Sequence, residues 1–447
     1  MQLNLDKITK SLLIISVIWI VIDGVFRKWV FPELSTPLFA VKYVLFSLTY
    51  LLFLLKTNFS IPPIKKFYQF LIVLLAIWCL LNFLNPTYKT SWLVKIFGLI
   101  NYLFFIPLTI IIPHYFNSFT FFEKTIRFIA YISIPIYIIG ILQYFLPEDH
   151  ILNYLPNEDQ KFNKVAEFIR SNSIFSFVKI YNVYLLFTTT LFFGYIFYLY
   201  RKNKSAFLYI ILLLFGILNQ FMTGSRLPLG LMVASFIIIS IYIFLNMLTL
   251  RKTITVSLVF GVITMLLAYN LSSTFNTAID AFFKRSEFVE QVAKKGVGEY
   301  SAKSRLIDKL TPFKFAEQAG WLGFGIGTTY QGTGMVLADW RNDLPFEEEG
   351  ERVVLELGII GGFLIFLSRL SILLYCYNML FRIKSIETNL LIITLILIIT
   401  PPLFFLNETT FNYLDNFIYW FAFSLVMALS KFITCEAART PQTIKMK

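Results

Sequence analysis

Long apolar runs recur along the whole of this 447-residue chain, and they limit what it can fold into. Each run holds about 20 mostly uncharged residues, which as a helix is long enough to cross a hydrocarbon core of ~30 Å. Hydrophobic residues make up 57% of the chain and the mean hydropathy is +0.71, whereas soluble domains are nearer ~45–50% apolar. The runs are continuous and do not alternate with polar residues, which favours helices over a barrel. The predicted fold class is therefore an all-α polytopic membrane protein.

About twelve transmembrane helices are expected from the lengths of these runs. Their approximate ranges are 11–27, 37–55, 67–84, 91–113, 126–146, 173–200, 205–222, 227–249, 253–270, 352–381, 389–406 and 413–433. Basic residues gather in alternate connections and at both ends of the chain. Because basic loops are retained in the cytoplasm, both termini are predicted to be cytoplasmic. The same bias accounts for the formal net charge of +13, so the charge does not indicate a nucleic-acid partner.

Two long connections, 147–172 and 271–351, fall on the predicted outer face. Loops of this length are uncommon unless they are functional. The chain is thus expected to comprise nine transmembrane helices in 1–270, a large outer loop in 271–351, and three further helices with a cytoplasmic tail in 352–447. Within the large loop, the patterning predicts helices from Ala278 to Lys295 and from Ser301 to Gln318, followed by a Gly-rich turn.

Several basic residues lie at the outer ends of the predicted spans, against the charge bias. They are Arg27, Lys28, Lys42, Lys89, Lys95, Lys179 and Arg226. A charge at the edge of a span usually faces protein or a water-filled cavity. Each lysine taken alone is also compatible with snorkelling to the headgroups, but together they predict an anion-binding cleft that opens outward. Asp23 lies four residues before Arg27 and can pair with it on one helix face.

Arg226 lies between two apolar runs, in the stretch NQFMTGSRLPLG from Asn219 to Gly230. It begins a predicted helix in which Pro228 suits the first turn, and it has no acidic residue within reach on that helix. An arginine at a helix N-terminus combines its own donors with free backbone amides, an arrangement that suits phosphate. The alternative is a solvated loop residue.

Four motifs occur in an order that is typical of a known family. The first is MTGSRLPLGLMVASFIII, from Met222, and the last is EEEGERVVLELGIIGGFLIF, from Glu347. Between them lie a further Ser-Arg at Arg305 and a Gly-x-Gly-x-Gly turn at 323–327. The chain resembles the superfamily of O-antigen polymerases and O-antigen ligases. The opening DGVFRKWVFP, from Asp23, is similar to that of exopolysaccharide polymerases in this group.

The resemblance implies a GT-C-like glycosyltransferase of the bacterial inner membrane whose site faces the periplasm. Its donor would be an undecaprenyl-pyrophosphate-linked oligosaccharide, and its acceptor a second lipid-linked glycan. Arg226 and Arg305 match the arginines that hold the pyrophosphate, so charge rather than a metal would stabilise the leaving group. We expect no metal and no cofactor, membrane lipid and lipid-linked glycans as partners, and a chain-length regulator as a possible protein partner.

The remaining site residues surround these arginines. We expect Arg352, Arg27 and Lys28 to help bind pyrophosphate, although Arg352 can instead pair with Glu356 at i,i+4. Ser225, Gly325 and Glu356 are expected to support the site. The general-base candidates are Glu347, Glu349 and Glu351, with a solvated acidic helix start as the alternative for each.

Two other functions stay open. Ligases of this family carry a His-Asn pair nine residues before the glutamate of the last motif, where this chain has Glu347 and Glu348. The missing histidine favours a polymerase over a ligase that transfers glycan to the lipid A core. A lipid-linked oligosaccharide flippase also has about twelve spans, but it is expected to show internal repeats and charges near the midplane. No Walker lysine, nucleotide fingerprint or metal motif is found in the sequence.

Overall fold

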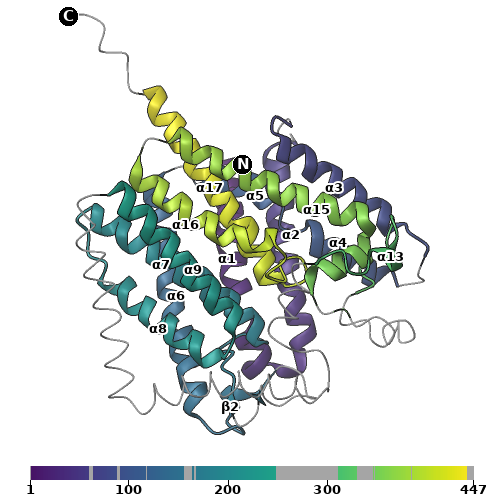
Figure 1. Ribbon diagram of the computed structural model, residues 1–447, viewed down its shortest axis with the longest axis horizontal. Coiled ribbons are helices and arrows are strands. Elements are labelled where there is room, and N and C mark those ends of the chain that lie inside the picture. Colours follow the sequence, from purple (N-terminus) through teal and green to yellow (C-terminus); the bar gives the residue numbers. More distant parts are fainter. Residues whose placement is uncertain are drawn as a thin grey trace, which may run out of the picture.

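The computed structural model describes residues 2–59, 64–87, 91–116, 118–155, 164–165, 168–247, 311–329, 346, 348–383 and 385–439. The described chain is almost entirely helical (Figure 1). The long helices before the large loop are α1 (Gln2–Val25), α2 (Ser35–Lys56), α3 (Phe67–Phe83), α4 (Trp92–Leu103), α5 (Leu108–Tyr115), α6 (Phe119–Phe145), α7 (Val178–Arg201), α8 (Phe207–Thr223) and α9 (Arg226–Asn246). They are followed by α13 (Ala316–Ala319), α15 (Glu349–Arg382), α16 (Ile386–Leu403) and α17 (Tyr413–Arg439). Short elements are the π-helix η1 (Phe26–Val30), the 3₁₀ turns η2 (Pro32–Leu34) and η3 (Ile151–Asn153), and the two-residue strands β1 (Lys164–Val165) and β2 (Phe168–Ile169), which pair antiparallel.

Eight of the described helices are long and apolar enough to cross a membrane, or nine if the bent pair α4 and α5 forms one span. Two further apolar helices, α3 and α8, are shorter. The prediction of a polytopic helical membrane protein is thereby confirmed. The helices coincide with eleven of the twelve predicted ranges, and the twelfth, 253–270, lies outside the described residues. The full twelve-span topology stays a prediction.

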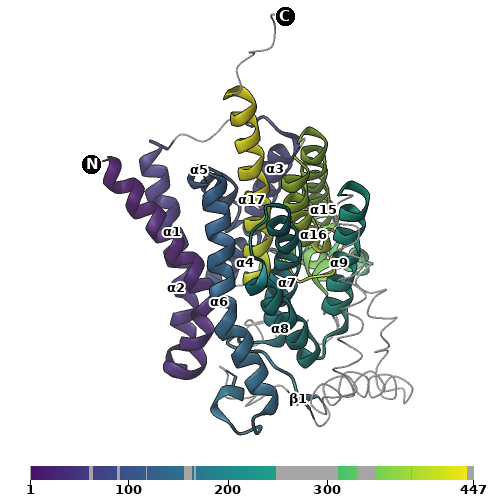
Figure 2. The ribbon, with the colours of Figure 1, turned by 90° about the vertical axis from the view of Figure 1, so that its left-hand side faces the viewer.

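Burial separates a central group of helices from a peripheral one. In the most apolar window of each helix, 89% of the residues of α17 and 78% of those of α7 are buried, against 22% in α2 and α9. Helix α16 packs against both α7 and α17, while α1 and α2 pack on each other at one side of the bundle (Figure 2). The exposed apolar side chains of α2 and α9 are what a lipid-facing helix requires. The start of α1 and the end of α17 lie at the same end of the bundle, as expected for termini on one side (Figure 2).

Helix α15 departs from the straight span predicted over 352–381. Glu349 and Arg369 are twenty residues apart, or about 30 Å along a straight helix, yet their side chains lie 2.6 Å apart. The chain reverses at Gly358, whose φ of 71° and ψ of −176° are not helical. The segment before Gly358 therefore folds back beside the long segment that follows it (Figure 1). Hydropathy did not indicate this fold-back, because the apolar residues on both sides of Gly358 are compatible with one continuous helix.

The Gly-rich turn at 323–327 packs against this reversal. A break in a helix leaves backbone carbonyls without their usual partners. Here the carbonyls of Leu355 and Glu356 accept hydrogen bonds from the amides of Phe324 (2.8 Å) and Gly325 (3.0 Å). A Cβ on Gly323 would lie 2.6 Å from the carbonyl oxygen of Glu356, so only glycine allows this approach. Two motifs that the sequence separates by thirty residues are thus one structural unit.

The predicted span 91–113 is also broken. Helix α4 ends at Leu103, and α5 begins at Leu108 after a bend of 47°. Pro107 lies in the break; it has no amide hydrogen to donate and disfavours helical geometry in the residue before it. The described part of the predicted helix 301–318 contains only turns and the short α13.

Candidate functional site

The candidate site lies at the end of the bundle where α1 ends and where α7, α9 and α17 begin. A loop, 169–176, whose residues 171–176 are buried, organises this end. Gln143 of α6 holds it with one amide oxygen, which accepts from the backbone amides of Asn172 (3.1 Å) and Ser173 (2.6 Å) and from Ser171 Oγ (3.3 Å). Gly24 of α1 lies against the carbonyl of Ile174, where any Cβ would collide. The loop is therefore fixed between α1 and α6.

The start of α9 joins this loop, as Arg226 begins the helix at the predicted position. Ser225 Oγ accepts hydrogen bonds from Arg170 Nη2 (2.8 Å) and Asn182 Nδ2 (2.7 Å). Arg170 Nε also donates to the carbonyl of Thr223 (2.9 Å). Two partly exposed arginines thus lie at the Thr-Gly-Ser-Arg turn. Arg226 belongs to the turn, and Arg170 is hydrogen-bonded to it. Arg170 was not among the predicted site residues, although it lies in the predicted outer loop 147–172 and the charge-bias criterion applies to it equally.

Arg27 and Lys28 contact the other side of the same loop from η1. Arg27 Nη1 donates to Ser176 Oγ (3.1 Å), and Lys28 Nζ donates to Asn172 Oδ1 (3.1 Å) and to the carbonyl of Ser173 (2.7 Å). Both cations are buried. The structure therefore gathers Arg27, Lys28 and Arg226 around the loop 169–176, and we call these three residues together with Arg170 the loop cluster.

Other cations of the predicted cluster have partners of their own. Lys42 Nζ lies 2.8 Å from Asp23 and over the rings of Phe39 and Tyr413. The predicted pair of Asp23 with Arg27 is present at 3.8 Å.

Two further cations of the predicted cluster also have partners. Lys95 Nζ donates to the carbonyl of Asn85 (3.1 Å), and the largely exposed Lys179 pairs with Glu408. Lys89 lies outside the described residues.

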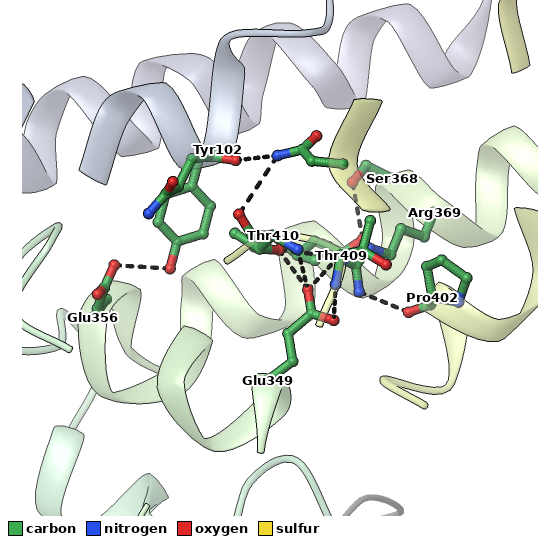
Figure 3. A network of polar contacts seen from close by, with 11 residues as sticks. Tyr102, Glu349, Glu356, Ser368, Arg369, Pro402, Thr409 and Thr410 are labelled. Atoms are coloured by element: carbon green, nitrogen blue, oxygen red, sulfur yellow. Dashed lines mark hydrogen bonds and ion pairs between the residues drawn. The ribbon is translucent and has the colours of Figure 1, made fainter. Parts of the chain in front are cut away.

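Glu349 belongs to a second, fully buried network (Figure 3). Its carboxylate accepts from Arg369 Nη2 (2.6 Å), from the amides of Thr409 (3.0 Å) and Thr410 (2.8 Å), and from Thr410 Oγ1 (2.5 Å). Arg369 also donates to the carbonyl of Pro402 (2.6 Å). Four hydrogen bonds already occupy both oxygens of this carboxylate, which favours a structural role for Glu349.

Arg352 and Glu356 are joined through Thr329 and not by the direct pair considered from the sequence. Thr329 Oγ1 donates to Glu356 Oε1 (2.5 Å), while Arg352 donates to Thr329 Oγ1 (3.3 Å) and to its carbonyl (3.1 Å). Glu356 also accepts from Tyr102 (3.0 Å), and the Arg352 guanidinium lies 3.7 Å over the ring of Phe411. These contacts hold the end of the Gly-rich turn on α15.

The remaining predicted residues divide between described and undescribed parts of the chain. Glu351 is buried; it accepts from the amide of Glu348 (3.3 Å) and lies 3.7 Å from Lys314 Nζ. Gly325 lies in the Gly-rich turn with a φ of 108°, a value that favours glycine. Arg305 and Glu347 lie outside the described residues. Within the described chain, no three His, Cys, Asp or Glu side chains gather as metal ligands would.

The connection between α16 and α17, residues 404–412, links the loop cluster to the Glu349 network. Glu408 pairs with Lys179 at the start of α7, while Thr409 and Thr410 bind Glu349. Directly after the connection, Tyr413 donates to Asp23 (3.3 Å), the carboxylate that also pairs with Lys42 and Arg27. No sequence motif had indicated this connection, because its contacts with Lys179 and Glu349 join residues far apart in the chain.

A small cavity of about 30 Å³ adjoins this connection. It is lined by Leu75, Asn101, Tyr102, Ile365, Ser368, Arg369, Ile372, Thr409, Thr410, Asn416, Tyr419 and Trp420. Thr409 Oγ1 and Tyr419 OH are buried and have no hydrogen-bond partner among the described residues. A polar cavity above ~10–15 Å³ is large enough for a water molecule with two to four partners.

We expect this cavity to be hydrated. If water binds Thr409, then Thr409→Val removes a hydrogen bond and lowers the free energy of unfolding by about 1 kcal/mol. The measurement is unfolding of the purified protein in detergent. A variant that is more stable than the wild type would indicate a dry cavity, since it would have lost only an unsatisfied hydroxyl.

Comparisons of the chain with protein-family models, with curated proteins and with solved structures find no match. The resemblance therefore rests on the motifs alone. The chain is a multi-pass helical membrane protein, and its described part brings Arg27, Lys28 and Arg170 to one loop at an end of the bundle.

Proposed function

We propose that this protein polymerises undecaprenyl-pyrophosphate-linked oligosaccharide repeat units into a surface polysaccharide, at the periplasmic face of the bacterial inner membrane and without a metal. The observation that carries the proposal is the loop cluster. Arg27 and Lys28 lie on one side of the loop 169–176, while Arg170 and Arg226 lie on the other at the N-terminus of α9. Guanidinium groups, an ammonium group and a helix N-terminus are all suited to a diphosphate.

In the proposed reaction, a hydroxyl oxygen of the acceptor sugar attacks the anomeric carbon of the donor. The bond between that carbon and the phosphate oxygen breaks, and the lipid diphosphate leaves with the electron pair. The cations of the loop cluster stabilise the charge that develops on the leaving group. The hydroxyl proton passes to a carboxylate, for which Glu347 and Glu351 are the better candidates because the carboxylate of Glu349 already accepts four hydrogen bonds. Attack opposite the leaving group inverts the anomeric configuration.

The test is polymerisation of lipid-diphosphate oligosaccharides by the purified protein, read as a ladder on a gel. We expect Arg226→Ala to reduce the rate at least ~100-fold, the loss seen when one charge-stabilising donor is removed. Arg201→Ala is the matched control, because Arg201 lies at the opposite end of α7 in a surface pair with Glu387 at 3.3 Å.

Three outcomes separate the alternatives. A ladder of full strength from Arg226→Ala contradicts the assignment of this arginine. Transfer of glycan to a lipid A core without a ladder indicates a ligase. Movement of lipid-linked oligosaccharide across vesicle membranes without a new glycosidic bond indicates a flippase.

A further inference from the structure

Lys28 is a buried cation without a carboxylate partner in the described chain. Its side chain is buried at the junction of η1 with the loop 169–176, and its two hydrogen-bond acceptors, Asn172 Oδ1 and the carbonyl of Ser173, are neutral. Burying a charge is costly unless it is paired. An ionisable residue in a membrane-spanning segment is accordingly a candidate for function.

Lys42 provides an internal comparison. It is also buried at the same end of the bundle, and both lysines lie over aromatic rings: Lys42 over Phe39 and Tyr413, and Lys28 over Trp29 at 4.9 Å. Lys42 in addition pairs with Asp23 at 2.8 Å. The fold therefore provides a counter-charge for one buried lysine and, among the described residues, none for the other. Both lysines are buried, and Lys28 differs from Lys42 in that no carboxylate of the described chain pairs with it.

The amide of Asn172 adds two further donors beside Lys28. An ammonium group can only donate hydrogen bonds, so the amide oxygen of Asn172 must be the atom that faces Lys28, and its nitrogen must face away. That nitrogen is buried and has no hydrogen-bond partner within the described structure. Lys28 has three donors and uses two. Three donor hydrogens thus lack an acceptor in the described structure: one on the Lys28 ammonium and two on the Asn172 amide. The Asn172 oxygen that binds Lys28 belongs to the same amide group as the unsatisfied nitrogen.

The loop that carries these donors is held in place. Gln143 Oε1 accepts from the amides of Asn172 and Ser173, Ser173 adopts a left-handed φ of 49°, and Ser173 Oγ donates to the carbonyl of Ile136 (2.6 Å). Two residues earlier, Arg170 reaches the turn before Arg226. The unsatisfied donors are therefore preorganised, and they lie on or against the same loop as Arg170, which reaches the N-terminus of α9.

We propose that Lys28 and Asn172 together bind the phosphoryl oxygens of the lipid diphosphate, beside Arg170 and Arg226; this inference rests on the proposed function. A phosphoryl group suits the site because it brings negative charge and several acceptor oxygens to a cation and a set of unsatisfied donors. A second phosphoryl group, joined to the first, extends from Lys28 toward the arginines.

The test is binding of undecaprenyl diphosphate to the purified protein, compared with inorganic pyrophosphate and with phosphatidylglycerol. In Asn172→Asp the new carboxylate pairs with Lys28, which raises the melting temperature and repels the ligand. We expect at least a tenfold loss of affinity for undecaprenyl diphosphate. Lys28→Gln is expected to lose affinity similarly. The matched control is Asn246→Asp at the opposite end of α9, where the amide donates to the carbonyl of Tyr242 in an exposed contact.

The outcomes distinguish the inference from the proposed function. Asn172→Asp with wild-type affinity overturns the site, even if the wild-type protein produces a polysaccharide ladder. Equal binding of phosphatidylglycerol overturns the assignment to the substrate diphosphate and indicates a general lipid-phosphate site. Tight binding of undecaprenyl diphosphate that Asn172→Asp abolishes, without any ladder from the wild type, supports the site and contradicts the polymerase.

Discussion

Replacing Glu349 with glutamine is expected to lower the free energy of unfolding by about 3–5 kcal/mol, because removing one partner of a buried ion pair leaves the other charge uncompensated. Arg369 is buried and has Glu349 as its only carboxylate partner in the described chain. The measurement is reversible unfolding in detergent or bicelles. Loss of the pair would also release the segment of α15 before Gly358, since Glu349 fixes it to the connection between α16 and α17.

The same substitution at an exposed pair is the control. Glu387→Gln removes the partner of Arg201, which lies 3.3 Å away and whose side chain is 40% exposed, and we expect a change within ~1 kcal/mol. The double variant Glu349→Leu with Arg369→Met should recover much of the stability, because apolar residues can replace a buried pair without leaving a lone charge. A loss below 1 kcal/mol for Glu349→Gln would show that the pair does not hold the fold-back.

Replacing Gly358 with alanine is expected to destabilise the fold by about 3 kcal/mol or more. Its φ of 71° and ψ of −176° belong to a region populated almost only by glycine, where strain costs about 1–3 kcal/mol. A Cβ would in addition collide with backbone atoms of Trp321 and Gly323. Because these atoms belong to the Gly-rich turn, the substitution would separate the turn from α15.

Gly230→Ala is the matched control for this prediction. Gly230 lies inside α9, and a Cβ there meets nothing within 4 Å. Alanine is favoured over glycine in a helix by ~1 kcal/mol, so this variant should be slightly more stable than the wild type. Equal unfolding free energies for the two variants would mean that the reversal at Gly358 is not required for the fold.

The positions of the helices can be predicted from the sequence, but the points at which they are interrupted cannot. Apolar length predicted the helices from α1 to α9 and from α15 to α17, since every membrane span must satisfy its own backbone hydrogen bonds. It did not predict the reversal at Gly358, because the pattern of apolar residues is the same in a straight helix and in a folded one.

For the candidate site, too, the sequence indicated which residues to consider but not their contacts. The charge bias drew attention to Arg27, Lys28 and Arg226, which the structure places around one loop; their role in binding stays a prediction. It did not reveal that Lys42 has a carboxylate within 2.8 Å while Lys28 does not. The run of acidic residues that includes Glu349 predicted a catalytic base. The contacts of Glu349 with Arg369, Thr409 and Thr410 instead favour a structural role.

By itself the sequence determined that this is a helical membrane protein and predicted its off-pattern cations at one end of the bundle, because hydropathy and charge act locally along the chain. Only the tertiary structure decided which cations are neutralised, where α15 turns back and that Asn172 stands beside Lys28. These contacts join residues as far as 229 positions apart. They depend on how the helices pack, which no local pattern specifies.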